Sequence, residues 1–156
     1  MQNQTVRDEF LAADSVLIAV DPGREKCGVA VVAPGSGATD KAQYRVLERS
    51  VVARGNVVAH LEEWLERFPG AILVLGDATA SRALQSEIAA HWPQLVVEMQ
   101  DERGSTLEAR ALYWREKPPR GWRKLWPLSL QMPPEALDDF AAVVLAQRFL
   151  ERKSGN

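Results

Sequence analysis

Acidic side chains follow several apolar segments of this sequence, at the points where buried strands would end. Asp21 follows the first segment, Asp77 follows a later one, and Asp101-Glu102 follows the last. Burying a lone carboxylate costs several kcal/mol unless a partner compensates its charge, so these positions favour chemistry over folding alone. They are candidate metal ligands or catalytic carboxylates. The structural alternatives are that Asp21 caps its own turn and that Asp101-Glu102 complements the dipole of the next helix.

A further acidic pair, Asp138-Asp139, lies at the start of the last predicted helix. Successive helical residues are about 100° apart, so only one of the two can face a given site, and complementing the helix dipole is the structural alternative. Carboxylates gathered at one edge would repel each other without a cation, and such hard oxygen ligands select Mg²⁺ or Mn²⁺. Two such ions about 4 Å apart would stabilise the attacking and leaving oxygens of a phosphoryl displacement.

A basic stretch that contains tryptophans runs from Arg103 to Lys124, where seven basic residues oppose two acidic ones in a chain of net charge −2. The overall charge excludes a general nucleic-acid coat protein, but local charge decides where a polyanion docks. Arginine and lysine neutralise phosphates, and tryptophan stacks on unpaired bases. For Trp122 and Trp126 the alternatives are stacking on bases and packing under a long loop. Trp114, in a helical segment, is expected to pack in the core.

The elements that must position these side chains follow from the hydrophobic pattern. Strands are predicted at residues 15–20, 27–33, 44–53, 71–75 and 95–99, and helices at 56–68, 80–92, 105–116 and from Pro134-Glu135 onward. Ser105 and Glu108 have the spacing of a capping box, which predicts the start of the third helix. Residues 117–134 hold five of the nine prolines and therefore predict an irregular loop.

This order of elements predicts an α/β domain, a mixed five-stranded sheet with helices on both faces. The first three strands are close in sequence and form an antiparallel meander, whereas strands separated by helices pair in parallel through right-handed crossovers. The carboxyl ends of the parallel strands share one edge, where ligands of open α/β sheets gather. We therefore expect Asp21, Asp77 and Asp101-Glu102 at that edge.

The length of 156 residues fits one domain, expected over residues 15–152 between flexible ends at 1–14 and 153–156. The single cysteine, Cys27, excludes an intrachain disulfide and a cysteine-based zinc site, and it is expected to be a small core residue. No apolar run approaches the roughly 18 residues of a membrane span, and the first residues lack the charge of a signal peptide. We therefore expect a cytoplasmic protein.

Three motifs stand in order along the chain: Asp21-Pro-Gly-Arg-Glu-Lys-Cys-Gly28, Asp101-Glu-Arg-Gly-Ser-Thr-Leu-Glu-Ala-Arg110 and Leu137-Asp-Asp-Phe-Ala-Ala-Val143. Together they resemble the YqgF (RuvX) family of the ribonuclease H-like superfamily, which also contains the RuvC Holliday-junction resolvases. The resemblance implies a ribonuclease H-like fold and a nuclease dependent on Mg²⁺ or Mn²⁺. Its substrate would be Holliday-junction DNA, the 5′ end of pre-16S rRNA, or both. The chain departs from the family pattern at Gly76-Asp77-Ala78, where common members carry Gly-Leu-Pro, and at Gly104, where they carry a bulky residue.

The same resemblance implies catalytic and metal-binding roles for Asp21, Glu102 and Asp138. Asp139 is the alternative to Asp138, and Asp77 and Asp101 are further candidate metal ligands. The residues expected to contact nucleic acid are Arg24, Lys26, Arg103, Arg115, Lys117, Arg120, Trp122, Arg123, Lys124 and Trp126. A symmetric junction would favour a homodimer. The alternative function is a catalytically silent nucleic-acid-binding or interaction module with the same fold, and the substrate is left open between DNA and RNA.

Overall fold

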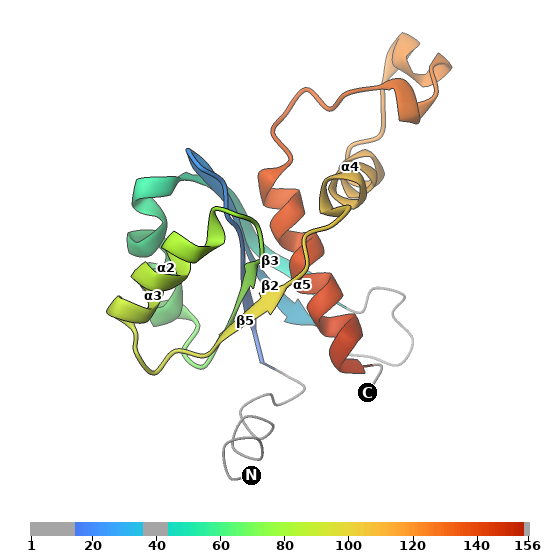
Figure 1. Cartoon of the computed structure of the whole chain (residues 1–156). Coiled ribbons are helices and arrows are strands. Elements are labelled where there is room, and N and C mark those ends of the chain that lie inside the picture. Colours follow the sequence, from blue (N-terminus) through green and yellow to red (C-terminus); the bar gives the residue numbers. More distant parts are fainter. Residues whose placement is uncertain (1–14, 36–43, 155–156) are drawn as a thin grey trace.

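The computed structural model describes residues 15–35 and 44–154 (Figure 1). The ends predicted to be flexible lie outside the described residues at 1–14 and 155–156. Lys153 and Ser154, expected in the flexible end, instead belong to the last helix, α5 (Asp138–Ser154). The Ser154 hydroxyl donates to the Leu150 carbonyl, and Arg152 and Lys153 lie in the last turn, where positive charge complements the helix dipole.

The five strands form a single mixed sheet, as predicted. They are β1 (Leu17–Asp21), β2 (Lys26–Pro34), β3 (Tyr44–Ala53), β4 (Ile72–Gly76) and β5 (Val97–Gln100). Their order across the sheet is β3-β2-β1-β4-β5. The pairs β1–β2 and β2–β3 are antiparallel, whereas β1–β4 and β4–β5 are parallel. The carboxyl ends of β1, β4 and β5 therefore meet at one edge of the sheet.

Helices cover both faces of this sheet (Figure 1). On one face lie α2 (Val57–Arg67), preceded by the short 3₁₀ turn η1 (Arg54–Asn56), and α3 (Ser81–His91). On the other face α5 crosses the sheet, with α4 (Ser105–Glu116) packed beside it. No helix among the described residues is both long and apolar enough to cross a membrane.

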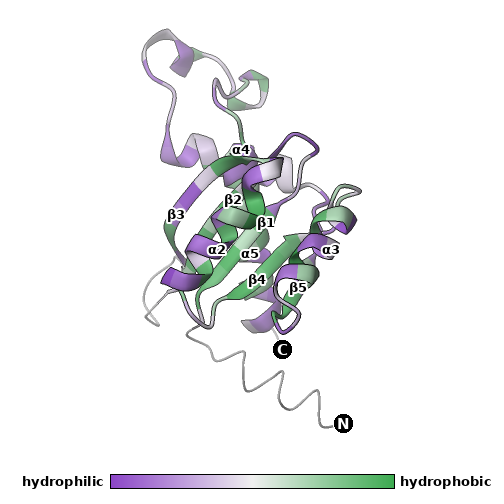
Figure 2. Ribbon diagram, turned by 90° about the vertical axis from the view of Figure 1, so that its left-hand side faces the viewer, coloured by the Kyte–Doolittle hydropathy of each residue, from purple (hydrophilic) through white to green (hydrophobic). Residues whose placement is uncertain are grey.

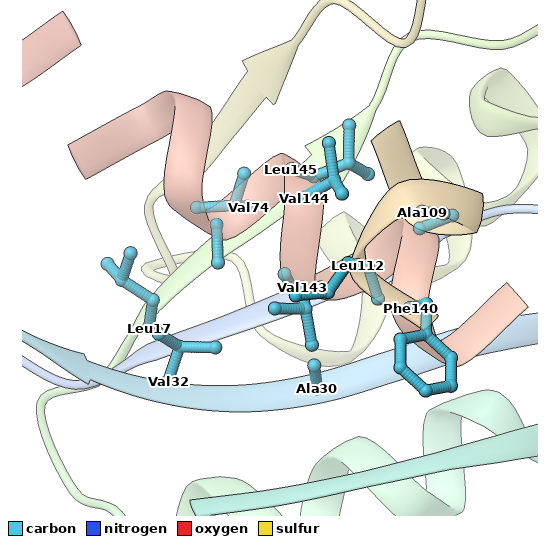
Figure 3. Close-up of a cluster of buried hydrophobic side chains, with 14 of the residues drawn as sticks. Leu17, Ala30, Val32, Val74, Ala109, Leu112, Phe140, Val143, Val144 and Leu145 are labelled. Atoms are coloured by element: carbon cyan, nitrogen blue, oxygen red, sulfur yellow. The ribbon is translucent and has the colours of Figure 1, made fainter. Parts of the chain in front are cut away.

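The alternation of side chains along β1 builds two hydrophobic cores, one on each face. Leu17 and Ala19 pack with α4 and α5, and Figure 3 shows this core between the strands and α5. Ile18 and Val20 pack with α2 and α3 on the opposite face. In Figure 2 the most hydrophobic residues accordingly lie in the central strands. Cys27 is fully buried in the second core, which confirms the expectation of a core residue.

One predicted helix cap and one predicted helix start are wrong. Helix α4 starts at Ser105 as predicted, but the position before it is Gly104 in the left-handed region at φ 72°, and the predicted capping box does not form. Glycine adopts this conformation freely, and it lets the chain turn directly from β5 into α4. Helix α5 begins at Asp138 and not at Pro134-Glu135, because its first helical hydrogen bond runs from the Ala141 amide to the Leu137 carbonyl.

A segment that we call the arm, residues 117–137, joins α4 to α5 and projects away from the two helical layers (Figures 1 and 2). It is not fully irregular as predicted, since it contains two short 3₁₀ helices, η2 (Gly121–Leu125) and η3 (Leu128–Leu130). An ion pair between Lys117 and Glu135 joins its two ends. The arm therefore leaves and re-enters the body of the protein at one place, beside the start of α5.

Candidate active site

Asp21 is the last residue of β1, and its backbone pairs with Gly28 of β2. On its other side β4 and β5 end at the same edge, with Gly76 paired to Gln100. Asp77 follows β4, and Asp101-Glu102 follows β5. The structure thus brings all these acidic residues to the carboxyl edge, where the sheet topology predicts them.

Glu102 lies over the end of β4, where only a glycine leaves room for it. A side chain at Gly76 would place its Cβ atom 1.8 Å from Glu102 Oε1. The Glu102 amide donates to Asp77 Oδ1 at 3.1 Å, which fixes the backbone at this point. Glu102 Oε1 is buried without a hydrogen-bond partner. An unsatisfied buried oxygen is costly, so this atom is available to a cation or a donor.

Asp138 reaches the same region from the start of α5. Its backbone carbonyl packs against Gly28, the residue that pairs with Asp21. Its carboxylate forms an ion pair with Lys26, in which Lys26 Nζ lies 3.1 Å from Asp138 Oδ2. Asp138 also interacts electrostatically with Asp21. Asp138 therefore lies near enough for its charge to act on Asp21, while its carboxylate is paired with Lys26.

Asp139 is engaged elsewhere. Its Oδ2 lies 3.2 Å from Nε of Arg49 on β3, and this carboxylate is only 17% exposed. Arg49 also pairs with Glu116 at 2.9 Å, and its guanidinium lies 3.9 Å from the centre of the Phe140 ring. Asp139 therefore anchors α5 to the sheet, which leaves Asp138 as the member of the pair whose charge acts on Asp21.

The electrostatics of Asp21 and Glu102 differ from those of ordinary surface carboxylates. Burial, the charge of Asp138 and a hydrogen bond from Glu102 together set the pKa of Asp21 at about 6, above its usual 3.8, with burial the largest cause and only the hydrogen bond acting to lower it. Burial and the charge of Asp21 raise the pKa of Glu102 to about 7. Both carboxyls therefore lose their protons less readily than surface carboxyls do, and groups with pKa values raised in this way are characteristic of functional sites.

The remaining acidic candidates support the backbone around Glu102. Asp77 accepts the Glu102 amide and does not cap α3, because the residue before that helix is Ala80 and no side chain caps it. Asp101 Oδ1 accepts the Arg103 amide at 2.9 Å and so caps its own turn. In the structure, both residues hold the loop that follows β5, while Glu102 enters the site.

The fit of this site to a divalent cation can be judged from its donor atoms. Among residues 15–35 and 44–154, no group of three or more Asp, Glu, His or Cys side chains stands close enough together to hold a metal ion. The tight convergence expected from the sequence is therefore not present, because the Asp138 carboxylate is turned to Lys26. The donors still fit a hard cation: they are all carboxylates, two have raised pKa values, and Glu102 Oε1 has no partner.

The basic residues and tryptophans predicted to contact nucleic acid fall into three groups. Arg24, Arg103 and Arg115 are exposed on the body, in the β1–β2 turn, after β5 and on α4. Lys26 and Lys117 form ion pairs with Asp138 and Glu135. The arm carries the rest, all exposed: Arg120, Trp122, Arg123, Lys124 and Trp126.

The exposure of three tryptophans can be compared with the expectations from the sequence. Trp114 is only 7% exposed in the core formed with α5, as predicted. Trp122 and Trp126 are 69% and 57% exposed, so neither packs under a loop.

Sequence reasoning missed two arginines that shape the site. Besides Arg49, Arg148 of α5 donates to the carbonyl of Asp101 at 2.8 Å and to that of Arg103 at 2.7 Å, and it pairs with Glu108. These bonds hold the loop that carries Glu102 against α5. Because both arginines act across long sequence separations, no local pattern could have revealed them. Gly28 and Gly76 were visible in the motifs, but their packing against Asp138 and Glu102 was not.

A mixed five-stranded sheet of this order, with α5 across one face and carboxylates at the ends of its parallel strands, is a ribonuclease H-like α/β fold of the RuvC type. The structure is similar to that of RuvC from Thermus thermophilus, with a TM-score of 0.58 and 20% identity over 90% of this chain and 96% of that one. T. thermophilus RuvC in complex with a Holliday junction substrate gives a TM-score of 0.56 at the same identity and coverage.

The fowlpox virus Holliday junction resolvase has a TM-score of 0.55 and 14% identity, over 88% of this chain and 99% of that chain. At such identities the likeness shows a shared fold. No protein-family model matches the chain, and no curated protein matches its sequence.

Proposed function

We propose that this protein is a divalent-metal-dependent nuclease that hydrolyses phosphodiester bonds in structured nucleic acid, and that it is a member of the YqgF (RuvX) family. The observation that carries the proposal is the buried Asp21–Glu102 pair with its raised pKa values, at the carboxyl edge of a fold shared with Holliday-junction resolvases. Its substrates would be Holliday-junction DNA, the precursor of 16S rRNA, or both.

In this proposal Asp21, Glu102 and Asp138 hold Mg²⁺ or Mn²⁺. When bound, these ions supply Lewis-acid activation of water and of the scissile phosphate. Glu102, with a pKa of about 7, must be deprotonated to hold a cation, so metal binding would release a proton near neutral pH. Lys26 neutralises Asp138 while that carboxylate has no other cation beside it.

The proposed substrate rests on the charge of the residues around the site and on the similar solved structures. Exposed arginines in the β1–β2 turn and after β5, Arg24 and Arg103, flank the carboxylates and would contact phosphates on either side of the scissile bond. One similar structure is described as a complex with a Holliday junction substrate. Because a four-way junction has two-fold symmetry, we also propose that the protein acts on it as a homodimer.

A cleavage panel tests this function. A Holliday junction, single-stranded DNA and a structured RNA would each be incubated with Mg²⁺, Mn²⁺ or EDTA. We expect metal-dependent cleavage that Asp21→Asn abolishes while binding remains intact. The matched control is Glu63→Gln, which changes an exposed carboxylate on α2 that pairs with Arg67 of the same helix. Cleavage retained in a clean preparation of Asp21→Asn would remove this residue from the mechanism.

The second candidate is a catalytically silent nucleic-acid-binding module. The observation that favours it is the Lys26–Asp138 pair, together with the absence of a ready-made metal cluster in the described part of the chain. The two candidates differ in their response to Mn²⁺. A nuclease binds the ion at Asp21 and Glu102 and cleaves, whereas a silent module binds nucleic acid equally well with EDTA and cleaves no member of the panel.

A further inference from the structure

The arm carries a hollow of its own, away from the acidic edge of the sheet. Its walls are Trp122, Arg123, Trp126, Leu130, Gln131 and Met132, and its volume is about 270 Å³. Small-molecule pockets usually span about 300–1,000 Å³, so this hollow suits a group of one or two rings. Trp122 and Trp126 lie in η2 and directly after it, and their exposure leaves their ring surface accessible.

The backbone around this hollow is held in place by side-chain hydrogen bonds. Gln131 Nε2 donates to the carbonyls of Arg123 at 2.7 Å and Trp126 at 2.9 Å. These bonds join η2 to the part of the arm that follows η3. From α4, Arg110 Nη2 donates to the carbonyls of Ser129 at 2.9 Å and of Gln131. A site whose backbone is already ordered loses less entropy on binding, which favours a ligand site over a random loop.

The same glutamine leaves an acceptor without a partner. Because Gln131 Nε2 makes two hydrogen bonds to carbonyls, the orientation of its amide is fixed, and Oε1 is the atom left over. Gln131 Oε1 is buried and has no hydrogen-bond partner in the described structure. A buried acceptor without a donor is costly, so a ligand that offers an N–H group would be favoured here.

The charge around the hollow selects the rest of the ligand. Among the described residues, the side chains of Arg120, Arg123 and Lys124 are exposed and form no ion pair. The one acidic residue of the arm, Glu135, is already paired with Lys117. A fitting ligand is therefore flat enough to stack on tryptophan, offers an N–H donor and carries negative charge beside the ring. An unpaired nucleotide has all three properties.

We propose that the arm hollow binds an unpaired nucleobase of a single nucleic-acid strand, stacked on Trp122 and Trp126, with Gln131 Oε1 accepting from the base edge and Arg123 and Lys124 on the flanking phosphates. A base in a duplex has its Watson–Crick edge and both faces occupied, so the hollow excludes it. This inference rests on the proposed function and specifies the substrate: nucleic acid that presents an unpaired stretch.

The place of the arm in the chain connects this hollow to the acidic edge. The Lys117–Glu135 pair joins the two ends of the arm just before Asp138. A nucleic-acid strand bound by the arm would therefore continue toward the end of the molecule where Asp21 and Glu102 lie. Figure 1 shows the arm rising from the end of the molecule at which α5 starts. The arm would thus choose the strand, and the carboxylates would act on it.

Binding is tested without cleavage, in EDTA. The probe is a fluorescein-labelled DNA strand of mixed sequence about ten nucleotides long, with its RNA counterpart and the matching DNA duplex, followed by fluorescence anisotropy. We expect the single strands to bind more tightly than the duplex and Trp126→Ala or Trp122→Ala to weaken them roughly tenfold or more. Trp126→Phe, which keeps a stacking ring, should restore most of the affinity. The matched control is Leu125→Ala, on the same arm, 85% exposed and outside the hollow.

Three results would overturn the inference. One is an unchanged dissociation constant in both alanine variants while circular dichroism shows a native fold. Another is equal affinity for strand and duplex. The third is that sedimentation shows a dimer of the unaltered protein and monomers of the alanine variants, with no change in single-strand binding. The hollow would then be a contact between copies of this chain. Failure of the nuclease proposal is distinguishable, because it appears as absent cleavage in Mn²⁺ whatever the arm binds in EDTA.

Discussion

The carbonyl of Asp138 lies so close to Gly28 that a side chain at residue 28 would place its Cβ atom 1.7 Å from that oxygen. The start of α5 therefore rests on the backbone of β2. A second glycine in the site, Gly76, has a different neighbour, because its Cβ position is filled by the flexible side chain of Glu102. Two glycines that look equivalent in the sequence thus support the site in two ways, one through backbone and one through a side chain.

Alanine at Gly28 should mainly lower stability, whereas alanine at Gly76 should mainly lower activity. Gly28→Ala must displace α5, so we expect it to lower the free energy of unfolding by about 2–3 kcal/mol. Gly76→Ala displaces only the Glu102 carboxylate, so we expect a loss below about 1 kcal/mol but a drop in cleavage of at least about tenfold. Urea denaturation and cleavage rates measured on both variants check this. Equal destabilisation by the two would contradict the difference in their neighbours.

The stability of the protein without metal should depend on pH through Asp21. Its pKa is about 6 in the folded protein and 3.8 in the reference state, so the folded state binds more protons between these values and stability falls as pH rises through this window. Asp21→Asn removes this effect. We expect it to raise the free energy of unfolding by on the order of 1–2 kcal/mol near about pH 8, and by less near about pH 5.

Urea denaturation in EDTA at both pH values measures this difference, with Glu63→Gln as the control for an exposed carboxylate. A stabilisation by Asp21→Asn that is the same at both pH values would show that the folded protein does not raise the pKa of this residue.

Lys26 should compete with a divalent cation for Asp138. Replacing it by glutamine removes a positive charge from the site and frees the Asp138 carboxylate, so we expect Mn²⁺ to bind roughly two- to fivefold more tightly. Isothermal titration calorimetry with Mn²⁺ measures the change. Lys117→Gln is the matched control, since it breaks a lysine–carboxylate pair on the arm. Weaker Mn²⁺ binding by Lys26→Gln would mean that Lys26 helps to form the metal site.

Arg49 should stabilise the fold more than other surface arginines do. Arg49→Met leaves Asp139 largely buried without its partner and removes the cation from the Phe140 ring, so we expect a loss of about 1–3 kcal/mol. Arg67→Met breaks the exposed pairs with Glu48 and Glu63, where we expect less than about 1 kcal/mol. Thermal or urea denaturation compares the two. A similar loss in both variants would contradict the anchoring role of Asp139.

Much of the fold was predictable because local rules determine it. The alternation and the turn signals located β3 at Tyr44–Ala53 without error, and the crossover rule gave the parallel and antiparallel pairs. The same topology placed Asp21 and Glu102 at one edge. Helix caps were less predictable: α4 starts at Ser105 as predicted, but a left-handed Gly104 precedes it and the capping box of Ser105 and Glu108 does not form.

The part of the site that the sequence left open depends on distant contacts. Asp138 and Asp139 are adjacent and chemically alike, and only the position of Arg49, on another element, separates their roles. In the same way, the order of the arm depends on Gln131 and Arg110, whose partners are backbone carbonyls that no sequence pattern marks.

The ion pair between Lys117 and Glu135 has a consequence for how the protein could be altered. Since the ends of the arm meet there, a short linker in place of the intervening residues would leave both helices and the whole sheet intact. The arm is thus a separable segment, whose length and composition could be changed by engineering while the sheet and its helices stay constant.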